Sequence, residues 1–278
     1  MNMRLRYFVV KREPTTYCGL NLVDTPDVDI FAEPVPPALS ALPGRFAALL
    51  QVVMCCGQLP TQTVIYGVLV LVGMKPPVGD ALPLPFFAAL SLIDTAVVTL
   101  MIFVFLRGSG ESIRQVFFGG RILSKEITLG FILIPVILVG TGILMGVVRL
   151  AFPGLHNVKI SPFDAFVDTG WHAALFVFTV IVAGGFREEL ARGFMLHRFD
   201  QKLGGIWVGQ AIYTVLFGAA HYTQGWDAVV TIGALGFFWG LLYIKRRSVA
   251  AAMVSHAGFD TLQVLGQLLI KTLGIPVR

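Results

Sequence analysis

Three stretches of the sequence place ionisable residues inside apolar surroundings. The stretch 185–194 follows an apolar run and holds four charges within six positions, on Arg187, Glu188, Glu189 and Arg192. The second stretch ends at His221, and the third begins at His256 and includes Asp260. Ionisable groups within membrane-spanning segments are costly and usually serve a function. We therefore expect the three stretches to meet at one site.

These residue types suffice for hydrolysis of an amide bond by water. Glu188 and Arg192 are spaced i, i+4 on one helix face, so the arginine would keep the carboxylate ionised. A carboxylate beside a neutral histidine can polarise water as a general base. Asp260, spaced i, i+4 from His256, would orient that imidazole, whose other nitrogen would face a developing oxyanion. The candidate catalytic residues are Glu188, Glu189, His221, His256 and Asp260, with Arg192 in support.

The composition places this site in a membrane protein. Of the 278 residues, 56% are hydrophobic and 13% are charged, whereas a soluble domain carries about 25% charged residues. We therefore expect an all-α fold, a polytopic bundle of about seven transmembrane helices. The net charge of +5 fits basic loops between spans, so the expected partner is the lipid bilayer and not nucleic acid.

The apolar segments divide the chain into four parts. These are a polar N-terminal tail, the first transmembrane helices with their loops, a catalytic core and a short C-terminal tail, over residues 1–44, 45–170, 171–270 and 271–278. Each expected span holds ~20 mostly apolar residues. The spans cover residues 46–74, 86–106, 128–148, a helix from 171, 206–220, 228–244 and 249–270. Pro60 interrupts the first span, which leaves an eighth span open, and Asp94 in the second is expected to hydrogen-bond a neighbouring helix.

Basic residues predict the orientation of this bundle. With the N-terminus in the cytoplasm, sixteen of the 21 Lys and Arg residues lie on the inner side and five on the outer side. Because basic residues collect in cytoplasmic loops, the sequence predicts a multi-pass protein of the cell membrane with a cytoplasmic N-terminus.

The ionisable residues can meet only if the fourth helix continues past Phe186. Apolar positions recur through 190–199, so we expect this helix to reach about residue 199. At ~1.5 Å of rise per residue, Glu188 then lies ~16 Å above the inner turn, His221 ~24 Å and His256 ~12 Å. Tilted helices bring such heights together, so the geometry permits a buried site.

The three stretches resemble the CPBP family of intramembrane proteases, which contains type II CAAX prenyl endopeptidases and bacteriocin-processing or immunity proteins. The family pattern is a glutamate pair followed by Arg, then Phe-x-x-x-His, then His-x-x-x-Asn or Asp. Here Phe217 with His221 matches the second part, and His256 with Asp260 the third, so the resemblance covers about residues 171–270.

The resemblance implies a membrane-embedded, CAAX-protease-like endopeptidase. Its first glutamate and first histidine would activate water, and its last histidine with the i+4 partner would stabilise the oxyanion. The substrate would be a membrane protein or a lipidated peptide. Such proteins were long labelled metalloproteases; we prefer a mechanism without a cofactor. In the alternative, zinc would be held by Glu188, His221 and His256.

This chain departs from the family pattern at the glutamate pair. The pattern is Glu-Glu-x-x-x-Arg, but here Arg192 comes one residue early. Aligned on the pair, Glu188 is the base; aligned on Arg192, Glu188 takes the second glutamate's place and Arg187 the first's. We favour Glu188 because it shares a helix face with Arg192, and Glu189 stays open. Because of the shifted arginine, a non-enzymatic immunity or scaffold protein remains an alternative function. Because buried acids and imidazoles can also carry protons, a proton-coupled transporter is another.

Overall fold

The structure is a computed structural model that describes residues 43–75 and 83–275. The chain divides into two units, residues 1–36 and 37–278. The first unit and almost all of the expected polar tail lie outside the described residues. All described residues belong to the second unit.

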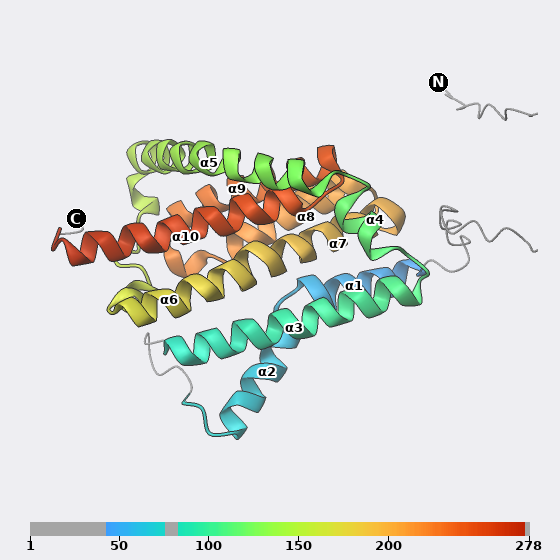
Figure 1. The fold of residues 1–278 in the computed structure, drawn as a ribbon, viewed down its shortest axis with the longest axis horizontal. Helices are drawn as coiled ribbons and strands as arrows, with labels where there is room; N and C mark the ends of the chain where they lie inside the picture. Colours follow the sequence, from blue (N-terminus) through green and yellow to red (C-terminus); the bar gives the residue numbers. More distant parts are fainter. Residues whose placement is uncertain (1–42, 76–82, 276–278) are drawn as a thin grey trace, which may run out of the picture. The chain divides into compact units, whose positions relative to one another are not determined.

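The described residues are mainly helical and contain no strand, which confirms the all-α class (Figure 1). The α-helices are α1 (Arg45–Cys56), α2 (Leu59–Leu71), α3 (Leu84–Gly108), α4 (Ile113–Phe118), α5 (Leu123–Ala151), α6 (Gly170–Thr179), α7 (Glu189–Lys202), α8 (Ile206–Ala219), α9 (Trp226–Arg246) and α10 (Ala250–Thr272). A π-helix, η3 (Val180–Glu188), joins α6 to α7. Three short 3₁₀ helices are η1 (Pro153–Leu155), η2 (Asp164–Val167) and η4 (Tyr222–Gln224).

The seven expected spans are all helical, but not all qualify as spans by length and hydropathy. Helices α3 and α9 and the segment Ile113–Ala151 each qualify. Helices α1 and α2 qualify together, bent by 46° at the break before Pro60. The described residues thus hold three candidate spans, or four with the bent pair, so the count of seven is not confirmed. These apolar helices indicate a membrane protein.

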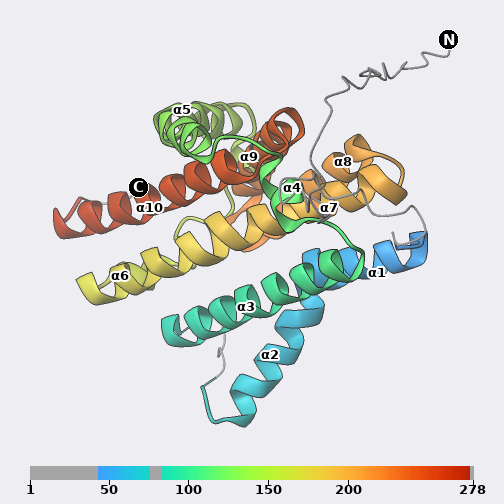
Figure 2. The same ribbon diagram turned by 45° about the vertical axis from the view of Figure 1, so that its right-hand side comes forward.

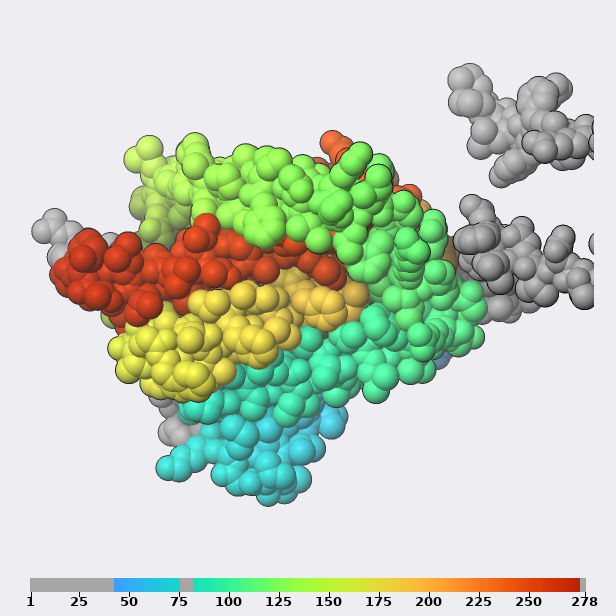
Figure 3. All heavy atoms as spheres, in the orientation of Figure 1, coloured from blue at the N-terminus to red at the C-terminus, as the bar shows by residue number. Residues whose placement is uncertain are grey.

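Helices α6, η3 and α7 form one uninterrupted helical segment from Gly170 to Lys202. The expectation that the fourth helix continues past Phe186 is therefore confirmed. This segment lies between α3 and α10 in both ribbon views (Figures 1 and 2), and the space-filling view shows the three side by side (Figure 3). Its π-helical middle is notable because short π segments within α-helices often occur at functional sites.

Helix α7 lies in the protein interior. Ten of its 14 residues are buried, so its polar side chains need partners within the protein. Arg198 donates to Glu111 before α4 (2.5 Å) and to Gln51 of α1 (2.8 Å). Although burial opposes ionisation of Glu111, hydrogen bonds from His197 and Arg198 lower its pKa to about 2. This polar cluster ties α7 to α1 and to the loop between α3 and α4.

Glycines allow α8 and α9 to pack closely. A Cβ atom on Gly218 would lie 2.7 Å from the Val229 carbonyl oxygen, and one on Gly236 would lie 2.5 Å from Phe217 Cδ1. A Cβ atom on Gly240 would overlap the Gln210 side chain. The glycine face of α9 thus serves close helix packing.

Candidate active site

Glu188 is the last residue of the π-helix and faces a cavity. Its carboxylate is 18% exposed, and Glu188 Oε2 lies 3.8 Å from His256 Nε2. Tyr213 of α8 donates from its hydroxyl to the Glu188 backbone carbonyl (3.1 Å). That bond fixes the main chain at Glu188, so the carboxylate is the part of the residue that is free to meet a ligand.

Glu189 points into the protein, although it is the next residue. Its side chain is 1% exposed, and it forms an ion pair with Arg192. The Glu189 Oε1 atom also lies 2.8 Å from His256 Nδ1. The expected pairing of Arg192 with Glu188 was therefore wrong: the arginine pairs at i, i+3 with Glu189. Both spacings share a helix face, and the helices that pack against α7 decide which glutamate the arginine meets.

Arg192 is enclosed by aromatic rings. Its guanidinium carbon lies 4.8 Å from the ring centroids of Tyr213 and Phe217, and 5.6 Å from that of Trp239. The side chain is fully buried. A guanidinium over aromatic faces is attracted by the ring quadrupole, so the rings and Glu189 together compensate the buried charge.

His256 is held between Glu189 and Trp239. The imidazole stacks on the Trp239 ring with centroids 3.8 Å apart and planes at 17°. Since a carboxylate only accepts hydrogen bonds, the contact with Glu189 places a proton on Nδ1. The Nε2 atom then faces the carboxylates of Glu188 and Asp260, the latter at 3.5 Å. We expected Asp260 to orient this ring; in the structure Asp260 lies near Nε2, and Glu189 holds the ring through Nδ1.

His221 lies two residues beyond the end of α8. Its Nδ1 atom is 2.8 Å from the Phe217 carbonyl oxygen of the preceding turn. A carbonyl only accepts, so Nδ1 carries the proton and Nε2 is the basic nitrogen of the neutral ring. The expected Phe-x-x-x-His motif thus also fixes the tautomer of this histidine.

One cavity of about 1000 Å³ unites these residues. Its wall includes Glu188, His221, His256 and Asp260, which come from η3, the end of α8, and α10. It also extends to Arg149 at the end of α5 and to Lys271 near the end of α10, so the site is not sealed among the helices. The structure thus brings together four of the five candidate catalytic residues at one cavity, and places Glu189 behind them.

Glycines bring η3 close to α10 at this point. A Cβ atom on Gly184 would lie 2.5 Å from Asp260 Oδ2, and one on Gly185 would lie 2.8 Å from Ala257 Cα. A side chain at position 185 would meet the backbone of α10, and one at position 184 would displace the Asp260 carboxylate. The pair Gly184-Gly185 therefore sets how closely Glu188 and His256 approach.

Sequence reasoning missed two residues of the site. Trp239 lines the cavity and stacks on His256, and Arg187 lines it on the side of α2 and α3. Trp239 lies between Gly236 and Gly240 in the sequence. Glycines on one helix face let a neighbouring helix come close, so a large ring there can contact that helix. Asp94, for which a bond between helices was expected, accepts from Thr61 (2.5 Å) and pairs with Arg187 (2.7 Å) at the same cavity.

The residues proposed for zinc do not fit a metal ion as they are arranged. Among residues 43–75 and 83–275, no group of three or more His, Cys, Asp or Glu side chains is placed to hold one. No step is therefore derived through a metal.

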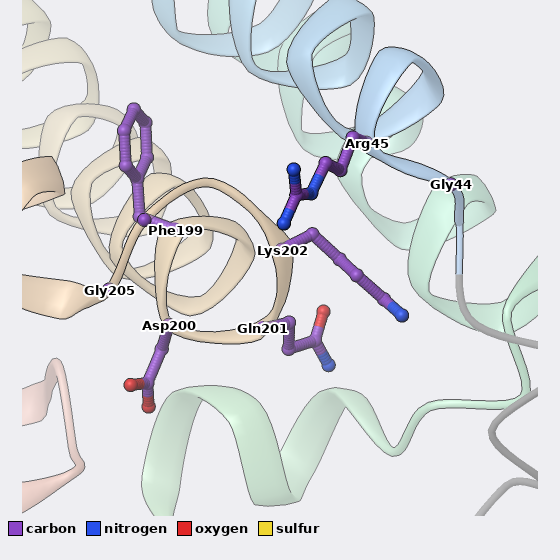
Figure 4. Close-up of a pocket in the computed structure, with 8 residues that line it drawn as sticks. Gly44, Arg45, Phe199, Asp200, Gln201, Lys202 and Gly205 are labelled. Carbon is purple, nitrogen blue, oxygen red and sulfur yellow. The ribbon is translucent and has the colours of Figure 1, made fainter.

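A second, smaller hollow lies at the other end of α7 (Figure 4). It measures about 420 Å³ and is lined by Gly44, Arg45, Phe199, Asp200, Gln201, Lys202, Gly204 and Gly205. None of these is a candidate catalytic residue, so the site chemistry belongs to the larger cavity.

Comparison with known proteins bears on the same part of the chain. Residues 169–262 match the family model described as type II CAAX prenyl endopeptidase Rce1-like. No curated protein and no solved structure matches the chain. The matched residues include every candidate catalytic residue, and the resemblance seen in the sequence is confirmed. Residues 169–262 are thus similar to the Rce1-like family, which is generally a family of proteases.

Proposed function

We propose that this chain is an intramembrane endopeptidase that cleaves a peptide bond with a water molecule activated by Glu188 and His221. The observation that carries the proposal is that Glu188, His221, His256 and Asp260, from three separate helical segments, line one cavity. The family match to CAAX prenyl endopeptidases supports the reaction class.

Each side chain has a role that its surroundings support. Glu188 takes a proton from water, and His221 Nε2 accepts the second hydrogen bond of that water and orients it. The resulting hydroxide attacks the scissile carbonyl carbon. The carbonyl oxygen becomes an oxyanion that accepts a hydrogen bond from protonated His256 Nε2. When the C–N bond breaks, Glu188 returns its proton to the leaving amine, so water is consumed and the protein is restored.

Glu189 and Arg192 position His256 in this scheme. The Glu189 carboxylate fixes the imidazole through Nδ1, and three carboxylates around the ring favour its protonated form. Protonation is what gives Nε2 the hydrogen that an oxyanion needs. Glu189 thus acts through His256, whereas Glu188 meets the water directly.

The substrate we propose is a lipidated peptide or a membrane protein. The family description names prenylated CAAX ends, and the exposed apolar helices keep the enzyme in the bilayer with such a substrate. We further propose a multi-pass arrangement in the cell membrane with the N-terminus in the cytoplasm, on the basis of the distribution of basic residues.

The test is cleavage of a farnesylated CAAX peptide by the purified full-length protein. We expect Glu188→Gln and His221→Ala to reduce kcat by about 10²-fold or more, since general base catalysis contributes about 10²–10⁴-fold. Glu189→Gln should reduce kcat less, because its effect passes through His256. Equal cleavage by the wild type and all three variants would refute the assignment, and so would wild type that leaves a broad panel of peptides intact.

Two further measurements separate the rival functions. Activity that survives a chelator agrees with the proposed metal-free mechanism, whereas activity lost to a chelator and restored by zinc would overturn it. Proton flux into liposomes that disappears in Glu188→Gln would instead support a transporter. A protein that shows neither cleavage nor flux would be a non-enzymatic member of the fold.

A further inference from the structure

One wall of the cavity carries a buried arginine whose donors are not all used. Arg187 is 4% exposed and lines the cavity, and its partner is Asp94 of α3 at 2.7 Å from Nη2. Its Nε and Nη2 atoms are buried, and neither makes a hydrogen bond among the described residues, although Nη2 lies at ion-pair distance from Asp94. A buried donor without a partner costs about 1–3 kcal/mol, and a charged one more. An arginine in this state is suited to receive an acceptor from outside the protein.

The surroundings of Arg187 fix its orientation. Asp94 Oδ2 holds one nitrogen of the guanidinium, while Asp94 Oδ1 accepts from Thr61 at 2.5 Å. The planar guanidinium presents five donors in a fork that matches a carboxylate. Asp94 occupies only part of that fork, so the remaining donors are available to a second carboxylate. The nearby wall is also polar, with Gln58, Gln62 and Ser91 lining the cavity.

The position of Arg187 relates this arginine to the proposed reaction. It directly precedes Glu188, and adjacent residues of a helix point in different directions. Arg187 therefore faces α2 and α3 while Glu188 faces His256, and both line the same cavity. A peptide that binds across the cavity would meet Arg187 on one side of its scissile bond.

We propose that Arg187 binds the free C-terminal carboxylate of the peptide substrate, held in place for this by Asp94 and Thr61. The inference rests on the proposed peptidase function and names the recognised part of its substrate. The enzyme would then prefer peptides that end within a few residues of the scissile bond. It would discriminate against chains whose carboxyl end is amidated or extended.

Binding tests this without requiring turnover. The probes are a farnesylated peptide that ends in Cys(farnesyl)-Val-Ile-Met with a free carboxylate and the same peptide as its C-terminal amide. Both are titrated into the full-length Glu188→Gln variant in detergent. A charge-assisted hydrogen bond contributes about 1.5–3 kcal/mol, so we expect the acid to bind about 10- to 100-fold more tightly than the amide.

Variants then assign the preference to Arg187. In the Glu188→Gln background, Arg187→Gln should bring the acid and the amide to equal affinity, and Arg187→Lys should keep part of the preference. Because Arg187→Gln leaves Asp94 buried and unpaired, the variant Arg187→Gln with Asp94→Asn is the second test. Arg198→Gln is the matched control, since Arg198 is also buried with an unpaired nitrogen but does not line the cavity.

The outcomes distinguish this inference from the proposed function. Equal binding of acid and amide to Glu188→Gln, or a preference that persists in Arg187→Gln, would overturn the role of Arg187 even if the wild type cleaves both peptides. A preference that depends on Arg187 in a protein that cleaves neither peptide would support the carboxylate site and refute the peptidase.

Discussion

Because η3 lies close to α10, alanine at Gly185 should lower stability, whereas alanine at Gly184 should lower activity. Gly185→Ala would place a methyl group 2.8 Å from Ala257 Cα and 2.9 Å from its backbone nitrogen, so one helix must move. Overpacking of this kind costs about 1–3 kcal/mol, and the gain in helix propensity returns about 1 kcal/mol. We therefore expect a net loss of roughly 0–2 kcal/mol in the free energy of unfolding. This corresponds to a fall in Tm of up to roughly 8 °C.

Gly184→Ala should instead reduce activity and leave stability nearly unchanged. Its methyl group would lie 2.5 Å from Asp260 Oδ2 and 4.0 Å from His256 Nε2, and its nearest neighbours contain no backbone atom of α10. The Asp260 side chain can rotate away without a helix shift. A displacement of about 1 Å at a site can cost about 10²-fold in rate, so cleavage of the farnesylated peptide should fall by up to that factor.

Gly140→Ala in α5 is the control for both variants. A Cβ atom there would have nothing within 4 Å, so only the helix propensity changes and stability should rise by about 1 kcal/mol. Thermal unfolding in one detergent, followed by the cleavage assay, compares the three variants. If Gly185→Ala is as stable as Gly140→Ala, the close approach of η3 to α10 does not exist. If Gly184→Ala cleaves like the wild type, Asp260 does not contribute at the site.

Three further predictions concern the buried polar groups. Because the pKa of Glu111 is lowered from 4.5 to about 2, its ionised form contributes stability that is fully present above pH 4.5 and is lost as the pH falls toward 2. At about 1.36 kcal/mol per pKa unit, this contribution is about 3 kcal/mol at most. The stability of Glu111→Gln should therefore depend less on pH in that range. An unchanged dependence of stability on pH would argue against the polar cluster around Glu111. Arg192→Met should lower the free energy of unfolding by about 3–5 kcal/mol, since the buried Glu189 carboxylate loses its arginine partner and keeps only His256. Arg192→Met with Glu189→Gln should recover much of that loss in chemical denaturation, and no recovery would contradict the pairing. Trp239→Leu removes the ring stacked on His256 and should lower kcat more than it raises KM, so an effect on KM alone would assign Trp239 to substrate binding.

Residue types and their order determined the class of this protein and the composition of its site. Long apolar helices require a membrane or a large core, so the all-α membrane class follows from hydropathy alone. The continuation of the fourth helix past Phe186 was also predictable, since apolar positions recur through 190–199 and no proline interrupts them. The number of spans was not predictable. Helix α7 carries too many charges to qualify as a span, and helix α8 is too short.

Only the tertiary structure decided which charge meets which. Helical periodicity places Arg192 within reach of both Glu188 and Glu189, and the choice of Glu189 depends on α8, α9 and α10 packed around it. The pairing of Arg187 with Asp94 joins residues 93 positions apart, and no local pattern encodes such a distance. The same holds for the stacking of Trp239 on His256. The spacing of residues along a helix determines which face a side chain lies on. The partner of that side chain depends on which helices pack against this face in the folded protein.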